Sequence, residues 1–549
     1  MIEKTKKKVL CFLIFLFNLT NLFAQQTNNL QVIWVKTTPD SVWAYGRDLA
    51  SGDINNDGYS DIAIIGDTLI DWGAIQPYRG RCWIFYGGPD MDTIPDIILQ
   101  NYCQDILGWV HLSDINNDGY SDVILSAGAN ANGYGEILIY LGGNPMDTIC
   151  DYIIRGPEEA SGLGSLGSGD INGDGYQDLI GGAAGWMGQR GKVFIYFGGP
   201  NFDTIPDVML NGGHYYYELF GYCVSGSGDV NNDGFSDVIV GAPEFGPSWW
   251  PEGRIYIYYG GNPMDTTYDI AMMGEPRWTL GIYGVDFIKN YQDFDCAIFG
   301  TPNCGPTGPH NYNPGILFLL KGCNSMDSIP DLNMIGRTEE SSLGFCTSSA
   351  GDVNGDLCDD IICGAVTEDS EKGRAYLWLG GPLLDTIPDA WLSGEQEEDY
   401  VGGVVKSAGD VNGDGRDEVL ISSYIATYHR NRVWVCKYTG TGIGEEGLMP
   451  YAKCNILEVY PNPAKTYTAI RYSLAAKSKV ALNIYDATGK KMRIIKIGSK
   501  IIDPGRYEMK WDLRDDENKK VSKGVYFIEL IAGQGKEKAR EIRKIVVTK

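Results

Sequence analysis

The sequence predicts an all-β protein, in which a seven-bladed β-propeller is followed by a small immunoglobulin-like β-sandwich. An acidic stretch recurs seven times along the chain, with 56 to about 66 residues between successive starts. Short runs of β-branched and aromatic residues accompany it, in general four to a copy, which is the repeat unit of a propeller. The last 94 residues abandon the repeat and reverse the sign of the charge, so they predict a separate domain.

Residues 1–24 predict a secretory signal peptide ahead of both domains. Four lysines precede the apolar run 9–17, and Leu22-Phe23-Ala24 offers a cleavage site before Gln25. The apolar run is too short to span a bilayer, and no other stretch approaches spanning length. We therefore expect an exported protein with no transmembrane segment after signal removal.

The charge differs sharply between the two predicted domains. Residues 25–455 contain 20 Lys and Arg against 59 Asp and Glu, whereas residues 456–549 contain 21 against 11. An acidic propeller would repel phosphates, so the composition argues against nucleic acid as a partner. Much of the acidity falls in the recurring stretch, where bound cations would neutralise it.

The recurring stretch is clearest at residues 229–237, Asp-Val-Asn-Asn-Asp-Gly-Phe-Ser-Asp. Its first, third, fifth and ninth residues carry carboxylate or amide oxygens, and the sixth, Gly234, allows a sharp turn. Oxygen ligands favour Ca²⁺, whereas zinc and copper prefer nitrogen and sulfur. A β-branched run, 238–240, follows in place of the helix of an EF-hand, so the stretch predicts a metal-pinned hairpin turn.

Six copies keep this ligand pattern, which predicts about six Ca²⁺ ions. Leu357 replaces the glycine of one copy, and Glu418 replaces the last aspartate of another. The predicted side-chain ligands are Asp53, Asn55, Asp57 and Asp61; Asp114, Asn116, Asp118 and Asp122; Asp170, Asn172, Asp174 and Asp178; Asp229, Asn231, Asp233 and Asp237; Asp352, Asn354, Asp356 and Asp360; and Asp410, Asn412, Asp414 and Glu418.

The fifth copy is degraded. We place it between Asp286 and Asp295, one residue longer than the others and without the middle ligands, and expect it to bind no metal. The cysteines Cys296, Cys304 and Cys323 lie in the same repeat, so a disulfide there could replace the missing metal.

The propeller is expected over residues 25–440, and its two ends are expected to meet. The seventh repeat stops after its third strand, 432–437, while a strand-like run, 30–36, precedes the first repeat. The N-terminal strand would therefore complete the seventh blade, which closes the ring and removes a free sheet edge.

The repeats resemble FG-GAP repeats, the seven-bladed propeller of integrin α subunits. The paired marks of that family are best kept as Phe220-Gly221 and Gly241-Ala242-Pro243. The resemblance implies Ca²⁺ in the six intact loops, with the seventh residue of each lending a backbone carbonyl. Those seventh residues are Tyr59, Tyr120, Tyr176, Phe235, Cys358 and Arg416.

A glycine-rich linker is expected over residues 441–455, and the β-sandwich over residues 456–549. Strand-like runs occur at 468–474, 479–485, 506–511, 525–531 and 540–547. The pieces Tyr460-Pro-Asn-Pro-Ala464, Gly524-Val-Tyr-Phe527 and a basic C-terminus resemble the C-terminal sorting domains of the bacterial type IX secretion system. That resemblance implies the secretion machinery as a partner, and a bacterial protein that is secreted or held at the outer cell surface. A structural or adhesive sandwich is the alternative.

The sequence favours a binding protein over an enzyme. The four histidines, His111, His214, His310 and His429, fall in different repeats, and no nucleophile motif is present. Aromatic residues cluster in two turns on the face opposite the metal loops, at Tyr215, Tyr216 and Tyr217 and at Trp249 and Trp250, where they could contact a glycan or an extracellular or cell-surface protein. A polysaccharide-active enzyme on the propeller scaffold, or a purely structural surface protein, remains the alternative.

Overall fold

The chain forms two compact units, residues 1–440 and residues 441–549. The computed structural model describes residues 29–38, 42–69, 78–100, 106–127, 135–156, 162–185, 190–213, 218–246, 251–275, 278–289, 294–303, 313–323, 325–338, 340–381, 384–423, 431–440, 454–460, 464–465, 467–474, 479–486, 490–496, 505–516, 519–534 and 537–548. The predicted signal peptide lies outside these residues.

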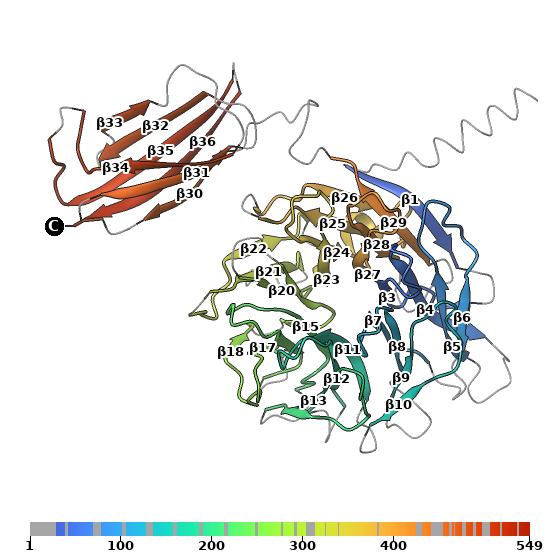
Figure 1. The fold of residues 1–549 in the computed structure, drawn as a ribbon. Helices are drawn as coiled ribbons and strands as arrows, with labels where there is room; N and C mark the ends of the chain where they lie inside the picture. The colour runs from blue at the N-terminus through green and yellow to red at the C-terminus, as the bar shows by residue number, and fades with distance from the viewer. Residues whose placement is uncertain are drawn as a thin grey trace, which may run out of the picture. The chain divides into compact units, whose positions relative to one another are not determined.

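The first unit is a ring of seven antiparallel sheets, or blades, each with its first strand at the centre of the ring (Figure 1). Blades one to four, from inner to outer strand, are β3 (Leu49–Gly52), β4 (Asp61–Leu69), β5 (Tyr78–Phe85) and β6 (Ile97–Gln100); β7 (Trp109–Ser113), β8 (Asp122–Ala127), β9 (Glu136–Tyr140) and β10 (Tyr152–Arg155); β11 (Leu163–Gly169), β12 (Asp178–Ala183), β13 (Lys192–Tyr196) and β14 (Val208–Asn211); and β15 (Cys223–Gly228), β16 (Asp237–Ala242), β17 (Arg254–Tyr258) and β18 (Ile270–Met273).

Blades five to seven repeat this arrangement. They are β19 (Val285–Ile288), β20 (Cys296–Thr301), β21 (Ile316–Lys321) and β22 (Leu332–Ile335); β23 (Leu343–Gly351), β24 (Asp360–Ala365), β25 (Arg374–Trp378) and β26 (Ala390–Ser393); and β27 (Val404–Gly409), β28 (Glu418–Ser422), β29 (Arg432–Tyr438) and β1 (Leu30–Thr37). The short strand β2 (Val42–Trp43) also pairs with β4, and α3 (Glu368–Glu371) is a single turn between β24 and β25. The predicted propeller is confirmed. No helix among the described residues is long and apolar enough to cross a membrane.

The N-terminal strand closes the ring, as predicted. β1 pairs antiparallel with β29, from Leu30 opposite Tyr438 to Thr37 opposite Arg432. Its Trp34 is 7% exposed and packs edge-on against Phe85 of blade one, with ring centres 5.2 Å apart. The Trp34 indole Nε1 also donates to a blade-one carbonyl, that of Asp92, at 2.7 Å. The closing strand therefore belongs to the sheet of blade seven and is fastened to blade one.

The hydrophobic core is divided into sectors between neighbouring blades. The second strands of blades two to six are buried along their whole length, because the next blade covers each face. They consequently read as continuous apolar runs such as Val238-Ile239-Val240 rather than as alternating ones. The sector between blades three and four, for example, packs Ile180 and Val193 against Phe220 and Val238.

The second unit is a two-sheet β-sandwich, as predicted. One sheet has the order β30 (Cys454–Tyr460), β31 (Thr468–Leu474) and β34 (Gly505–Trp511). The other has the order β33 (Lys491–Lys496), β32 (Lys479–Asp486), β35 (Gly524–Gln534) and β36 (Glu537–Val547). Ile470 and Trp511 from the first sheet share a core with Leu482 and Ile528 from the second.

Two strands of the second unit were not expected from the sequence, namely β30 and β33. β30 begins at Cys454, inside the predicted 441–455 linker, so the sandwich starts two residues earlier than the expected 456. Between the end of β32 and the start of β33, the Asp486 N–H donates to the Lys490 carbonyl at 2.9 Å.

Replacing Trp34 with alanine should destabilise the propeller by about 3–5 kcal/mol, because it empties a buried site at the closing strand. Ile33→Ala, a change at the neighbouring residue that is 40% exposed, should cost about 1 kcal/mol or less. Urea unfolding of the full chain measures both free energies. Equal losses in the two variants would contradict the role given to Trp34.

Candidate metal-binding loops

Each predicted metal loop connects the first and second strands of its blade and is shaped by its own ligand side chains. In loop 53–61, the two carboxylate oxygens of Asp53 accept the N–H groups of Asp57 and Gly58 at 3.1 and 2.9 Å. Asn55 Oδ1 accepts the Asp57 N–H at 2.9 Å, and Asp57 Oδ1 accepts the Tyr59 N–H at 3.0 Å. These bonds turn the first, third and fifth side chains toward the inside of the loop.

The other five predicted loops fold in the same way. Their first carboxylates accept the N–H groups of the fifth and sixth residues at 2.8–3.1 Å; these are Asp114, Asp170, Asp229, Asp352 and Asp410. The sixth residue has positive φ, as for Gly58 at +89°. Leu357 takes the same conformation at φ +68° with its side chain 73% exposed, so the missing glycine leaves this loop intact.

The ninth residue fastens the loop to the rest of its blade. In blade one, Asp61 is fully buried, and its two oxygens accept the N–H groups of Ile54 and Gly87 at 2.9 and 2.8 Å. Gly87 begins the turn after the third strand, so one carboxylate joins both turns on this face. The equivalent carboxylates are Asp122, Asp178, Asp237 and Asp360.

Burial raises the pKa of the Asp61 carboxyl to about 7, against the effect of its two N–H donors, and the carboxylates of Asp57 and Asp53 raise it further. The same causes raise the pKa values of Asp122 and Asp237 to about 7. A buried carboxylate beside two others carries uncompensated negative charge. A divalent cation in the loop would supply the opposite charge.

The donor set fits calcium in residue type and order, with side-chain oxygens at the first, third, fifth and ninth positions. Among the described residues, no three His, Cys, Asp or Glu side chains already converge as a metal cluster. In four loops an asparagine amide instead donates to the fifth carboxylate, as Asn116 Nδ2 does to Asp118 Oδ2 at 3.0 Å. Hydrogen bonds therefore give the loops their shape before any ion binds. The third residue presents its side-chain oxygen toward the inside of the loop.

Neighbouring loops are hydrogen-bonded to one another around the whole ring. The Ser121 N–H of blade two donates to the Asp53 carbonyl of loop one at 2.8 Å, and the Gly143 N–H donates to the Ile54 carbonyl at 2.9 Å. Equivalent backbone bonds join every successive pair of blades, including blade seven to blade one, where the Ser60 N–H donates to the Asp410 carbonyl at 3.0 Å. The loops therefore form one continuous belt on one face of the propeller.

The predicted alignment of the fifth loop is wrong. Asp286 lies within β19 and not at the start of the loop, because Ile288 pairs with Cys296 at the base of the hairpin. Lys289 therefore takes the first position and Cys296 the ninth, so the loop is one residue shorter than the others rather than longer. Cys296 and Cys323 are not joined by a disulfide, and Cys304 lies outside the described residues.

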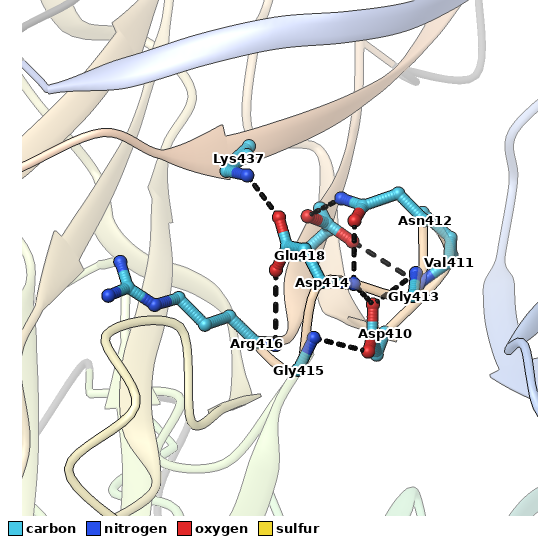
Figure 2. Close-up of polar contacts among 9 residues, drawn as sticks. All are labelled: Asp410, Val411, Asn412, Gly413, Asp414, Gly415, Arg416, Glu418 and Lys437. Carbon is cyan, nitrogen blue, oxygen red and sulfur yellow. Dashed lines mark hydrogen bonds and ion pairs between the residues drawn. The ribbon is translucent and has the colours of Figure 1, made fainter. Parts of the chain in front are cut away.

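The seventh loop keeps the fold of the others but differs at its ninth and fifth residues (Figure 2). Glu418 Oε2 accepts the Val411 N–H at 3.2 Å, and its Oε1 accepts a hydrogen bond from Asn412 Nδ2. Asp414 Oδ2 forms an ion pair with the Lys437 ammonium, which comes from β29. Lys437 was not expected from the sequence, because it lies 19 residues beyond the loop and outside its motif.

A second titratable group, also missed by the sequence analysis, lies on the inner strands. Burial lowers the pKa of Lys406, but the Asp48 and Asp286 carboxylates outweigh it and hold that pKa above its ordinary value. Asp286 accepts hydrogen bonds from Ser225 Oγ and Ser348 Oγ, both at 2.8 Å. His111 lies 2.9 Å from a serine hydroxyl, and burial lowers its pKa to about 4. These hydrogen bonds join the inner strands of neighbouring blades, namely blade five with blades four and six, and blade two with blade three.

The predicted ligand-contacting aromatics, Tyr215 to Tyr217 and Trp249 to Trp250, lie outside the described residues, as do His214, His310 and His429. The residues that flank the two aromatic segments both contact β17. Glu218 Oε1 accepts the Tyr256 hydroxyl at 2.6 Å. The Arg254 guanidinium lies 4.8 Å from the ring centre of Phe245. Glu218 and Phe245 therefore both lie against β17 of blade four.

Comparisons with known proteins agree with this architecture. The FG-GAP repeat family matches residues 163–196 and 220–258, and the secretion system C-terminal sorting domain matches residues 458–548. Integrin alpha-5 of Xenopus laevis is 32% identical over 214 residues, covering 36% of this chain and 20% of that protein. Integrin alpha-8 of Mus musculus is 30% identical over 251 residues, covering 43% of this chain and 21% of that protein.

A third relative is the phosphatidylinositol-glycan-specific phospholipase D of Dictyostelium discoideum, 30% identical over 240 residues, or 37% of this chain and 25% of that protein. The chain thus spans a quarter or less of the length of these relatives. The matches confirm both resemblances expected from the sequence, the FG-GAP repeats and the sorting domain.

Replacing Asp237 with alanine should destabilise the calcium-free propeller by about 2–4 kcal/mol, because the buried N–H groups of Val230 and Gly260 lose their acceptor. Asp233→Ala, in the exposed part of the same loop, should cost about 1 kcal/mol or less. Denaturant unfolding in EDTA separates the two. A smaller loss for Asp237→Ala than for Asp233→Ala would show that the ninth carboxylate does not hold the turns together.

Proposed function

We propose that this integrin α-like FG-GAP propeller is a calcium-dependent binding module that acts outside the bacterial cell. Its sorting domain directs it through the secretion machinery to the outer surface or the exterior. The observation that carries the proposal is the belt of loops, in which one oxygen-rich motif recurs blade after blade in a chain that matches integrin α subunits. Its partner is a glycan or an extracellular protein.

Calcium has a structural part in this proposal. The loops at 53–61, 114–122, 170–178, 229–237, 352–360 and 410–418 supply the oxygen ligands, and the fifth loop, which begins with Lys289, supplies none at its first position. A bound ion supplies positive charge to carboxylates that burial otherwise disfavours in their charged form. Because the loops are bonded into a belt, ordering each of them stiffens the whole face.

Partner binding is assigned to the opposite face, at blade four. The aromatic segments containing Tyr215 and Trp249 are flanked by residues that both pack on β17, which supports their emergence close together. Exposed tryptophan and tyrosine are enriched at binding hot spots. In this proposal the propeller binds its partner without chemical turnover. The similarity to a phospholipase suggests the alternative, hydrolysis of a glycan-linked lipid, which the same assays would detect.

Removing calcium should lower the melting temperature, since each site filled at ten times its Kd stabilises the fold by about 1.4 kcal/mol.

The affinity of the loops for calcium should also fall as the pH drops from 8 to 6. Burial raises the pKa values of the ninth carboxyls of loops one and two, Asp61 and Asp122, to about 7, so below that pH calcium must displace protons from them. Calorimetric titration at both pH values and elemental analysis measure these effects. Two or fewer ions per saturated chain, or a melting temperature indifferent to EDTA, would defeat the proposal.

The double substitution of Trp249 and Trp250 by alanine should abolish binding to the partner found on a glycan and extracellular-protein array, while calcium binding and folding persist. Tyr467→Ala removes an exposed aromatic residue, 40% accessible, from the sandwich and serves as the matched control. Unchanged affinity in the double variant would move the binding site elsewhere. Hydrolysis of an array component by the purified protein would favour the enzymatic alternative.

A further inference from the structure

We propose that the Lys437 ammonium acts as the built-in cation of the seventh loop, so that this loop stays free of calcium at concentrations that fill the other five. The inference rests on the proposed binding of calcium by the loops, and it lowers the expected number of bound calcium ions from six to five. It concerns this chain's own side chains, because the loop motif at 410–418 is nearly complete and by itself predicts an ordinary site.

Lys437 occupies a defined register position. Cys436 pairs with Val419, the residue after Glu418, so Lys437 follows the first pair of the hairpin. In the other blades that carry a complete loop, this register holds an uncharged side chain. The equivalent residues are Tyr86, Leu141, Phe197, Tyr259 and Leu379. A lysine at this register places an ammonium beside a calcium loop in blade seven alone of these six blades.

The Lys437 ammonium contacts a carboxylate oxygen whose equivalent in four other loops accepts a hydrogen bond from an asparagine. In loops two, three, four and six, the fifth aspartate accepts its Oδ2 hydrogen bond from the asparagine two residues earlier, as Asp118 does from Asn116. In loop seven, Asp414 Oδ2 contacts Lys437, and Asn412 turns its amide to Glu418 instead. The third, fifth and ninth side chains are thus all engaged in one network that contains a positive charge (Figure 2).

Ring closure explains why this network forms only here. In the other complete blades, the turn after the third strand begins with a glycine whose N–H holds the ninth carboxylate, as Gly87 holds Asp61. Blade seven has no such turn, because β29 continues to Tyr438 and pairs with β1. Glu418 therefore lacks that donor, and its longer side chain reaches Asn412. The same continuation carries Lys437 along the edge of the loop.

A divalent cation would meet the ammonium as a like charge a few ångströms away. The side chains of Lys437 and Asp414 are 34% and 29% exposed, so solvent screens the repulsion only in part. Even a well-screened pair of this kind weakens binding on the order of tenfold. Blade five also has a lysine at this register, Lys321, and there the loop has lost its ligands and begins with Lys289.

The test counts bound calcium in the full mature chain by equilibrium dialysis at a free concentration that saturates the main class of sites. The wild-type protein should bind five ions, and Lys437→Met should bind six, or bind the sixth on the order of tenfold more tightly. Lys437→Arg keeps the charge and should remain at five. Lys321→Met, the matched change in blade five, should also remain at five because that loop lacks ligands.

Six ions in the wild-type protein would overturn the inference, whether or not the variants fold, and would leave the proposed function standing. An unchanged count and affinity in a folded Lys437→Met protein would overturn it as well. A count near zero in every protein would instead reject calcium binding by the loops. A second readout is stability in EDTA, where Lys437→Met should be less stable than wild type and should recover on addition of calcium.

Discussion

The architecture depends on one interaction, the acceptance of two backbone N–H groups by a buried aspartate at the ninth position of loops one, two, three, four and six. Asp61 ties the second residue of its loop to the glycine that begins the turn after the third strand. Since that turn also donates to the preceding loop, the carboxylate fixes both the shape of its own blade and the distance to its neighbour. Buried charge is costly unless it is compensated, so each of these five loops favours a bound cation.

Most of the fold could be predicted because it follows from a repeat. The period, the glycine turns and the apolar second strands identify the blades, and the truncated seventh repeat identifies the closing strand. The fifth loop was misaligned because Asp286 and Asp295 imitate the two ends of the motif. The register is decided instead by packing, since Val285 and Phe287 face the core while Asp286, between them, bonds to serines of the neighbouring inner strands.

The residue types of the candidate metal loops could be predicted from the sequence, but the differences between individual loops could not. The loop motif does not include Lys437, whose contact with Asp414 depends on β29 continuing past the usual turn. The motif also does not predict that the ninth carboxylates accept hydrogen bonds before any ion binds. Within the sandwich, β33 was missed because the run Lys491-Met-Arg-Ile-Ile-Lys496 is short and bounded by lysines. Its pairing with β32 is settled by tertiary contacts.

The closure by β1 has a consequence for the order in which the protein can fold. Leu30 pairs with Tyr438, so a contact that completes the ring spans most of the propeller's length. Until the seventh blade exists, the blade at each end of the growing arc has an apolar face that no neighbour covers, and the loop-closure entropy of the whole domain is still to be overcome. Interruption of synthesis at any blade would leave two uncovered apolar faces, so completion of the last blade removes the surfaces through which the unfinished chain could aggregate.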